Sequence, residues 1–525
     1  MPSKDITLRH TLEGGWATDF GPMVMTPPQQ DGSILVPFLA DAQNMEYVMP
    51  RGVRKIGGTA VLNSATLGSA TTNVMGLHDY WRMGTSGTPT RKKICHAGTV
   101  LYADNDDNVF ASIATGLEAD KVPFYCQFYD KLVISSNSTV DVPLLYDQTT
   151  CAALTGSPPA FQFSCHHVQR LWAAGVAGAP STVYYTGIGD ETNWSGAGSG
   201  SIDVQPGDGD KITALISYKG DLWVFKGPNK GSIHRISGNT VSTFSLKVFI
   251  QGLGAAGPHC VAPYGDDVAF VWSTGTVHSL KATASYGDYN QAFLTQPIDT
   301  FIRNNINHSR TSASWLIDDI INSRLLLCTS YNAYQYNGLI MAYDYRFSPG
   351  RWSRWDAYNA QCLGYFIEGG AKDRRIYVGG TDGQIRRTNM PSRNIDGSGA
   401  ISASAVLPTF TYGSSSEVKI LNHLGLGVVP TGNYNANVYW SRDGKSQQST
   451  TVSLQGGDTI GNNWAPGVST LGGLRYTNNY ADAIDGDEFR GIQYQITNTS
   501  IDQEMEVHDL QATITFTGQF VTENS

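Results

Sequence analysis

Residues 265–280 read Gly-Asp-Asp-Val-Ala-Phe-Val-Trp-Ser-Thr-Gly-Thr-Val-His-Ser-Leu. Two apolar runs rich in β-branched and aromatic residues flank a Ser-Thr-Gly sequence, a pattern that predicts two strands joined by a tight turn. Residues 379–386, Gly-Gly-Thr-Asp-Gly-Gln-Ile-Arg, repeat this order with a Thr-Asp-Gly turn. Helical periodicity is almost absent from the chain, so we expect an all-β protein.

Short apolar runs of this kind recur along the sequence. One apolar position in each run marks its register, and neighbouring marks are 32 to 57 residues apart. A period of roughly 40 to 50 residues, with about four strands per unit, is typical of β-propeller blades. Six or seven such units fit between residues 70 and 395. The register marks are Val100, Leu132, Leu171, Leu222, Val268, Leu325 and Ile376.

Three regions are expected from changes in texture along the chain. Residues 1–65 read as an N-terminal arm with a Pro27-Pro28 break, and residues 66–395 as the β-propeller. Residues 396–404, Asp-Gly-Ser-Gly-Ala-Ile-Ser-Ala-Ser, are small and polar, as is usual at a boundary. Beyond them, alternating runs among Asn and Gly turns predict a C-terminal antiparallel β-sandwich over residues 396–525.

The amino-acid composition excludes some classes of function. Charged residues make up 15% of the 525 residues, against about 25% in an average soluble protein. The net charge of -9 argues against a protein that reads nucleic-acid sequence, because such proteins carry a basic stripe. It leaves open a protein that encloses DNA without gripping it, since gripping requires Lys and Arg to displace counterions.

Compartment and redox state follow from two further patterns. No apolar stretch is long enough for a membrane helix, and the first twenty residues lack the apolar core of a signal peptide, so we expect synthesis in the cytoplasm and no membrane insertion. The seven cysteines are widely spaced and odd in number, which favours buried reduced thiols over a disulfide framework. They are Cys95, Cys126, Cys151, Cys165, Cys260, Cys328 and Cys362.

Acidic clusters are the first candidates for a metal site. Asp203, Asp208 and Asp210 could supply oxygen ligands to calcium, but the segment lacks the ligand order and the late Glu of an EF-hand. A tight Pro-Gly-Asp-Gly turn whose Asp side chains cap backbone amides is the favoured interpretation. The same interpretation applies to residues 104–108 and 485–488. Residues 165–167, Cys-His-His, cannot converge on one ion within a strand, because neighbouring side chains point to opposite faces.

Other motifs also have ordinary structural explanations. Residues 252–257 match G-x-G-x-x-G, but no helix follows to hold a phosphate. Trp352 and Trp355 could form a sugar-stacking platform, although packing between blades is favoured. Residues 441–445, Ser-Arg-Asp-Gly-Lys, only approach the turn that marks propeller glycosidases. We therefore assign no catalytic, cofactor-binding or metal-ligating residue and expect no enzymatic activity.

A family resemblance is carried by one ordered set of segments. Residues 170–174 (Arg-Leu-Trp-Ala-Ala), 183–194 (Val-Tyr-Tyr-Thr-Gly-Ile-Gly-Asp-Glu-Thr-Asn-Trp) and 201–215, with its Pro-Gly-Asp-Gly-Asp turn, are followed by residues 222–226 and 233–236. Residues 43–59, 343–355 and 379–384 add weaker matches, so the likeness covers roughly residues 40 to 390. This order resembles the β-propeller virion proteins of tailed phages, and the tail nozzle (tail tubular protein B-like) of short-tailed phages in particular.

The resemblance implies a structural protein of the virion tail. It implies a homo-oligomeric ring, a hexamer in the family, around the DNA exit channel, in contact with tail adaptor proteins and tail fibres. Genomic DNA would pass through the ring without sequence-specific binding, no cofactor would be needed, and lysis would release particles assembled in the host cytoplasm. Alternatives are a tail hub or connector protein, and a propeller tail protein that binds or hydrolyses glycans.

Overall fold

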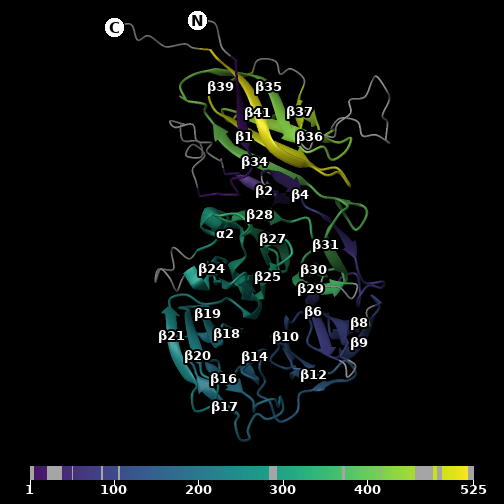
Figure 1. Ribbon diagram of the computed structural model, residues 1–525, viewed down its shortest axis with the longest axis vertical. Helices are drawn as coiled ribbons and strands as arrows, with labels where there is room; N and C mark the ends of the chain where they lie inside the picture. Colours follow the sequence, from purple (N-terminus) through teal and green to yellow (C-terminus); the bar gives the residue numbers. More distant parts are fainter. Residues whose placement is uncertain are drawn as a thin grey trace. The chain divides into compact units, whose positions relative to one another are not determined.

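The computed structural model describes residues 5–19, 38–49, 51–83, 87–104, 107–282, 293–368, 373–413, 415–455, 477–481 and 487–517 (Figure 1). The chain divides into two compact units. Unit 1 comprises residues 1–59, 342–357 and 389–525, and unit 2 comprises residues 60–341 and 358–388. Within the described ranges, no helix is long and apolar enough to cross a membrane.

Unit 2 is a β-propeller, as the strand pattern predicts. The number of its sheets falls within the predicted range of six or seven blades. Each blade consists of strands that are consecutive in the chain and lie next to one another in a sheet. In chain order the sheets are β6 (Val74–Met83), β7 (Pro89–Ala97), β8 (Val100–Asp104) and β9 (Phe110–Thr115); β10 (Pro123–Phe128), β11 (Lys131–Ser136), β12 (Leu144–Tyr146) and β13 (Cys151–Ala153); β14 (Phe163–His167), β15 (Arg170–Ala174), β16 (Thr182–Tyr185) and β17 (Gly200–Asp203); β18 (Lys211–Tyr218), β19 (Asp221–Gly227), β20 (Ser232–Ser237) and β21 (Ser245–Gln251); β22 (Val261–Tyr264), β23 (Asp267–Val271) and β24 (Val277–Ser279); β25 (Trp315–Asp319), β26 (Arg324–Ser330) and β27 (Asn337–Asp344); and β29 (Cys362–Glu368), β30 (Asp373–Gly379) and β31 (Ile385–Met390).

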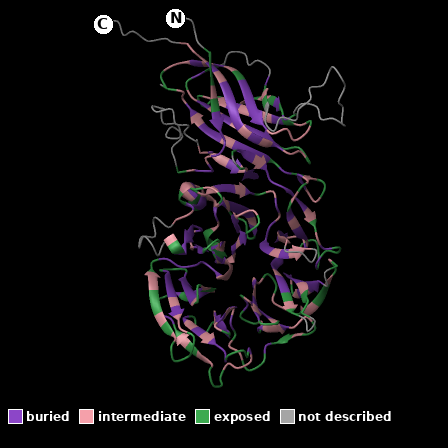
Figure 2. Cartoon of the chain, viewed as in Figure 1, coloured by how far each residue is buried: buried purple, intermediate pink, exposed green. Residues whose placement is uncertain are grey.

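The first strand of each sheet lies at the centre of the propeller. These inner strands pack against one another in chain order, and β29 packs against β6, which closes the ring. Short helices occupy connections between blades: η1 (Pro258–Cys260), η2 (Gln296–Ile298), α2 (Asp299–Asn305) and η3 (His308–Ala313). Burial follows this arrangement, because β19 is almost wholly buried while the outer strand β21 is largely exposed, as Figure 2 shows.

The ring is completed by residues from the N-terminal side of the propeller. The Leu62 amide donates to the Ile385 carbonyl at 2.8 Å, and the Asn63 side chain accepts from the Ile385 amide at 2.7 Å. Asn63 Nδ2 also donates to the Gly383 carbonyl at 3.1 Å. The last blade is therefore joined to a segment more than 300 residues earlier, the usual way in which propellers avoid leaving an open edge.

Turn chemistry explains why the inner hairpins are tight. Lys219 and Gly220 connect β18 to β19, and both have positive φ (50° and 82°). Two consecutive positive φ values are characteristic of a type I′ turn, whose twist matches that of the flanking strands. Val168 and Gln169 adopt the same backbone signs between β14 and β15 (48° and 58°), a costly conformation for β-branched Val168.

Unit 1 is built from the two ends of the chain. Its elements are β1 (Asp5–Thr11), β2 (Asp41–Gln43), β3 (Met45–Tyr47), β4 (Val53–Lys55), β28 (Arg351–Trp355), β32 (Asn394–Ile395), β33 (Gly399–Ala400), β34 (Ala403–Phe410), β35 (Lys419–Val428), β36 (Asn435–Arg442), β37 (Gln448–Ser453), β38 (Thr477–Tyr480), β39 (Asp487–Phe489), β40 (Ile492–Asn498) and β41 (Glu506–Phe516). Three strands span the division between the units: β5 (Gly58–Val61), β27 and β31.

Two sets of paired strands organise unit 1. In one set, β41 pairs with β1, β4 and β35, and β35 also pairs with β38 and β39. In the other, the order is β28-β2-β34-β40-β36-β37. His10 on β1 packs against Phe410 on β34, with ring centroids 4.1 Å apart, so the two sets contact each other.

The structure assigns the predicted arm differently from its sequence pattern. Residues 5–11 form β1, which pairs along its whole length with β41 near the other end of the chain. β2, β3 and β4 likewise pair with strands of unit 1. The described part of residues 1–59 is therefore an integral part of unit 1, while Pro27-Pro28 lies outside the described residues.

Candidate functional site

A cavity of about 530 Å³ lies at the centre of the propeller, lined by the inner strands β6, β10, β18, β22, β25 and β29 together with η1 and β30. Ring closure brings the inner strands of several blades around a common space, so residues far apart in the sequence meet here. The volume is in the range of sites that hold small molecules. We therefore take this cavity as the candidate functional site.

His259 closes one part of the propeller centre. His259 lies on η1, which directly precedes β22. Its Nε2 donates to the Pro123 carbonyl at the start of β10, at 2.6 Å. Its ring also stacks on Trp315 of β25, with centroids 3.5 Å apart and planes at 13°. Burial lowers the pKa of His259 to about 4, against the opposing effect of the Pro123 bond, so the ring is neutral at pH 7.

A second histidine lines the cavity without a hydrogen-bond partner. His78 on β6 stacks on Tyr125 of β10, with centroids 5.1 Å apart and planes at 13°. Burial lowers the pKa of His78 to about 4, and the nearby His259 lowers it further. His78 Nε2 and the Tyr125 hydroxyl are both buried, and neither has a partner among the described residues. Each could donate or accept one hydrogen bond to a ligand or to water.

Arg374 supplies the cavity with a positive charge. It lies on β30, and its guanidinium carbon sits 3.4 Å from the centroid of the Tyr365 ring on β29, a close cation–π contact. Its Nε is buried and has no partner among the described residues. The negative groups of the lining are Asp79 and Asp318, and Asp79 is bound to Arg91 at 2.5 Å.

The three aspartates considered as calcium ligands bind other groups of the protein. Asp210 accepts hydrogen bonds from the backbone amides of residues 229, 230 and 231, at 2.7 to 2.9 Å. Asp208 pairs with the buried Lys226 ammonium at 2.8 Å, and Asp203 accepts from the Thr182 hydroxyl at 2.7 Å. Asp210 thus caps backbone amides, as the turn interpretation expects, whereas Asp208 forms an ion pair and Asp203 accepts from a hydroxyl group.

The Cys165-His166-His167 segment forms the end of β14, and its side chains go to different neighbours. His167 Nδ1 bonds the Ser217 hydroxyl at 2.9 Å, whereas His166 packs on Phe128 with centroids 5.0 Å apart. Within the described ranges, no group of three or more His, Cys, Asp or Glu side chains is placed to hold a metal ion. All seven cysteines are free thiols.

Trp352 and Trp355 do not form an exposed platform, which corrects the glycan-stacking alternative at these two positions. Both lie on β28 and are only 1% and 6% exposed. Trp355 Nε1 donates to the Met45 carbonyl at 2.9 Å, and Trp352 packs against Tyr343 at 4.9 Å. Large rings on this strand are used for packing.

The remaining motifs are turns as well. Asp443, within residues 441–445, has a positive φ of 46° and accepts from the amides of Arg490 and Gly491. Asp104 pairs with Lys93 at 2.9 Å, while residues 105–106 of the same cluster lie outside the described residues. Residues 485–486 of the 485–488 cluster also lie outside them. Gly252, in the G-x-G-x-x-G string, has a positive φ of 88° directly after β21.

Sequence reasoning missed every polar residue of the cavity discussed above. His78, Tyr125, His259 and Arg374 come from β6, β10, η1 and β30, and no local spacing connects them. A signal was available only in the unusual placement of His and Tyr within apolar inner-strand runs. That signal has no meaning until ring closure shows which strands share the axis.

Comparison with known proteins adds the fold and no more. No protein-family model matches the chain, and no curated protein sequence matches it. Among solved structures, YCF48 bound to a D1 peptide is similar, with 10% identity over 64% of this chain and 97% of that one, at a TM-score of 0.37. The computationally designed Ika8 protein matches 63% of this chain and all of its own, with 10% identity and a TM-score of 0.36. An exo-β-1,3-galactanase from Phanerochaete chrysosporium matches 87% of this chain and all of its own, with 9% identity and a TM-score of 0.28.

Proposed function

We propose that this protein is a non-enzymatic structural subunit of a short-tailed phage tail, a nozzle subunit that assembles into a ring around the DNA exit channel. The proposal starts from the ordered likeness to phage propeller proteins. The pieces of that likeness between residues 170 and 236 fall on consecutive strands, β15 to β20, of two adjacent blades. A tail hub or connector is the nearest alternative.

One observation carries the proposal: the residues that make up the likeness hold loops together. Arg170 donates to the carbonyls of Thr186, at 2.6 Å, and Gly198. Asp210 and Lys226 tie the Pro-Gly-Asp-Gly-Asp loop to the neighbouring strands through the bonds described above. In a catalytic motif we would expect charged side chains to face a cavity. The Arg170, Asp210 and Lys226 side chains instead bind backbone and side-chain groups of neighbouring loops and strands, which favours a structural role.

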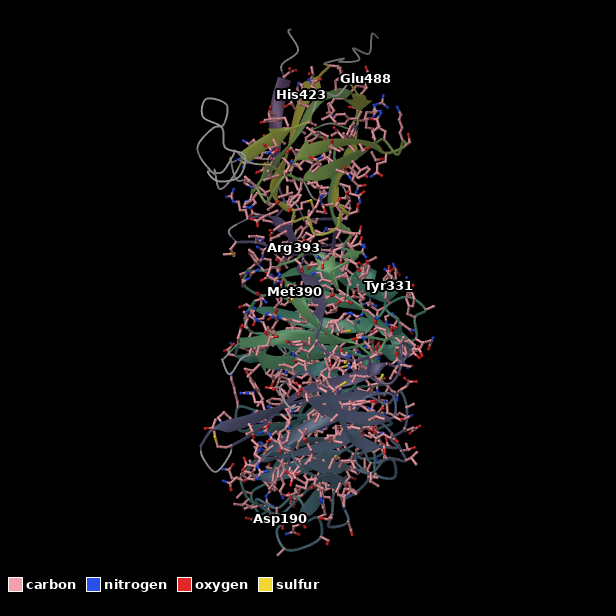
Figure 3. The ribbon with its side chains drawn as sticks, turned by 90° about the vertical axis from the view of Figure 1, so that its right-hand side faces the viewer. Asp190, Tyr331, Met390, Arg393, His423 and Glu488 are labelled. Carbon is pink, nitrogen blue, oxygen red and sulfur yellow. The ribbon has the colours of Figure 1, made fainter. Side chains whose placement is uncertain are left out.

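The loop that follows β16 shows the same use of polar residues. Asp190 accepts from the amide and hydroxyl of Thr192, at 2.9 and 2.7 Å, which fixes the turn at the outer end of the propeller (Figure 3). Glu191 pairs with Lys131 of β11, which connects one blade to the preceding one. Contacts of this kind hold neighbouring blades in a fixed arrangement, which a structural subunit requires.

Self-assembly is supported by apolar side chains on the hairpin end of the inner strands. Trp81 on β6 is 42% exposed and Tyr129 in the β10–β11 turn is 48% exposed. Gln127 donates to the backbone carbonyls of both residues, so the two segments lie side by side. Interfaces are enriched in aromatic residues and depleted of charge, and we assign this aromatic pair to contact with a second copy of the chain.

A second part of the proposal concerns unit 1, which we interpret as an antiparallel β-sandwich of the platform type. Support comes from buried apolar side chains in both strand sets: Leu424, Leu426 and Val428 on β35 are fully buried, as is Ile496 on β40. The His10–Phe410 contact joins the two strand sets across this interior. Alternating inward residues on two facing sheets are the basis of sandwich cores.

The remaining features of the proposal come from the phage likeness and the charge. The partners are further copies of the chain in a ring, tail adaptor proteins and tail fibres. A net charge of -9 suits a lumen that repels phosphates, so that genomic DNA slides through without binding. A hydrolytic alternative is disfavoured because Asp79, one of the two cavity carboxylates, is held by Arg91.

The test is antibody labelling of phage particles that contain this protein, viewed by negative-stain electron microscopy. The proposal predicts label at the distal end of the tail. In parallel, native mass spectrometry should show rings that Trp81→Ser and Tyr129→Ser weaken, whereas Tyr334→Ser, a change at another tyrosine that is 69% exposed, leaves them intact. Label confined to side appendages, or absent from particles, would refute the nozzle assignment.

A further inference from the structure

The central cavity brings together three buried polar groups that have no hydrogen-bond partner among the described residues. His78 Nε2, the Tyr125 hydroxyl and Arg374 Nε are all buried, all lack a partner among the described residues, and all belong to residues that line the same cavity. A buried polar group without a hydrogen bond costs about 1–3 kcal/mol. Three such groups around one space can all donate or accept hydrogen bonds to a polar ligand.

Arg374 differs from its neighbours on the same sheet. Arg375 binds Asp373 at 2.6 Å, Arg386 binds Asp382 at 2.6 Å, and Arg387 binds Glu368 at 2.9 Å. Arg374 has no ion pair with any described residue. Asp319, an acid whose pKa burial raises and on which Arg374 has only a small lowering effect, accepts a hydrogen bond from Asn322 at 2.7 Å. The guanidinium is therefore held in place by Tyr365 and is free to bind an anion.

The other walls restrict what that anion can be. Phe124, Trp315 and Tyr365 make the lining partly aromatic, and the two histidines are neutral at pH 7. Asp79 and Asp318 also line the cavity, and Asp79 is paired with Arg91. The Asp318 carboxylate would repel a phosphate, which carries nearly two negative charges at pH 7, more strongly than a ligand with one charge. One guanidinium beside this acid suits a ligand with a single negative charge and several hydroxyl groups.

We propose that the central cavity binds a hexuronic acid, a sugar ring that carries one carboxylate. The carboxylate pairs with the Arg374 guanidinium, which can hold it through two parallel hydrogen bonds. The apolar face of the ring stacks on the aromatic wall, and its hydroxyl groups bond His78, Tyr125 and the Asp carboxylates. This site is independent of the proposed nozzle role, since it lies within a single propeller.

Isothermal titration of the purified full-length chain with galacturonate and glucuronate tests the site, with galactose, acetate and inorganic phosphate as comparison ligands. We expect saturable binding of at least one uronate, binding of galactose at least ten-fold weaker, and none of acetate. Arg374→Gln should weaken uronate binding at least ten-fold, and Tyr125→Phe several-fold. The matched control, Arg375→Gln on the same strand, should leave binding unchanged.

Several results would overturn the inference. They are no saturable uronate binding at tens of millimolar, equal binding of acetate, tighter binding of phosphate, or equal loss in the Arg374 and Arg375 variants. Circular dichroism of each variant verifies that the propeller is folded before titration. Because the titration needs no particle, failure here leaves the labelling test of the nozzle assignment untouched.

Discussion

Replacement of Lys226 by Met should destabilise the propeller strongly. The Lys226 side chain is fully buried on β19, and its ammonium donates to the Val204 and Gln205 carbonyls and to Asp208, each at 2.8 Å, with the Ser181 hydroxyl at 3.2 Å. Met preserves the length and the apolar stem of the side chain, so the change removes the charge and its bonds with little loss of packing.

The magnitude follows from which acceptors water can reach. Each hydrogen bond to a charged group contributes about 1.5–3 kcal/mol. Gln205 is exposed and Asp208 is partly exposed, so water replaces much of their loss, whereas Val204 is buried. Removal of one partner from a buried ion pair costs about 3–5 kcal/mol, and we expect a value in the lower half of that range here.

The pH dependence provides an internal check. Burial raises the pKa of Asp208, but the hydrogen bond and charge of Lys226, together with the backbone amide of Asp210, outweigh it, so the pKa lies below its ordinary value. A carboxyl group whose folded pKa is lowered adds stability above its unfolded pKa and loses it as the pH falls through the folded value. The difference between wild type and Lys226→Met should therefore shrink in acid.

Urea titration followed by tryptophan fluorescence measures the effect, since Trp172 and Trp223 lie in the hydrophobic clusters beside this loop. The midpoint should fall clearly for Lys226→Met and stay constant for Lys230→Met, an exposed residue near the same loop. An unchanged midpoint for Lys226→Met at pH 7 would show that the buried ammonium is dispensable and that the reasoning about this loop is wrong.

Three further predictions rest on single contacts. Asp210→Ala should lower the urea midpoint by the equivalent of about 2–3 kcal/mol, because three backbone amides lose their acceptor, and Asp203→Ala, at an exposed carboxylate, should have little effect; equal effects would contradict this. Burial lowers the pKa of His10 to about 4, against the effect of Asp509. The neutral ring therefore stabilises unit 1 fully above pH 6.5, and the free energy of unfolding should fall by about 3 kcal/mol between pH 6.5 and 4. An acid titration of the His10→Phe variant should not show this fall. Burial raises the pKa of the Cys126, Cys260 and Cys151 thiols to about 12, 12 and 11, so a bulky thiol reagent should label the native protein slowly and the urea-unfolded protein at all seven sites, and rapid native labelling would refute the assignment.

The propeller could be predicted because its signal is local. A blade is a meander of neighbouring strands, so apolar runs and Gly-rich turns such as residues 265–280 report it directly. Pairings between distant segments leave no such trace. β1 pairs with β41 across some 500 residues, and Asn63 completes the last blade at Ile385. The N-terminal segment therefore reads as an arm, because its partners occur only at the far end of the chain.

The candidate site was beyond sequence reasoning for a related reason. The acidic turns stand out in the sequence because Asp and Gly are conspicuous together, yet Asp208 and Asp210 serve the framework. The cavity residues His78 and Arg374 are inconspicuous, because each is a single polar residue in an otherwise ordinary strand. Their common location depends on how many blades close the ring and on the register of each inner strand, neither of which a local pattern determines.

The closed centre of the propeller constrains how the nozzle proposal can be true. His259 reaches from η1 to the Pro123 carbonyl of β10, and its ring stacks on Trp315 of β25, so side chains from three blades meet across the axis. A DNA duplex, whose major groove alone is about 12 Å wide, cannot pass through such a centre. Under the nozzle proposal, the DNA channel would therefore have to form between subunits, and the proposal requires self-assembly of the chain. The Trp81 and Tyr129 variants therefore test the step on which the nozzle proposal depends, which is ring assembly. If these variants abolish ring formation, they should also abolish the infectivity of particles that carry them. The uronate site inside each propeller should still bind its ligand.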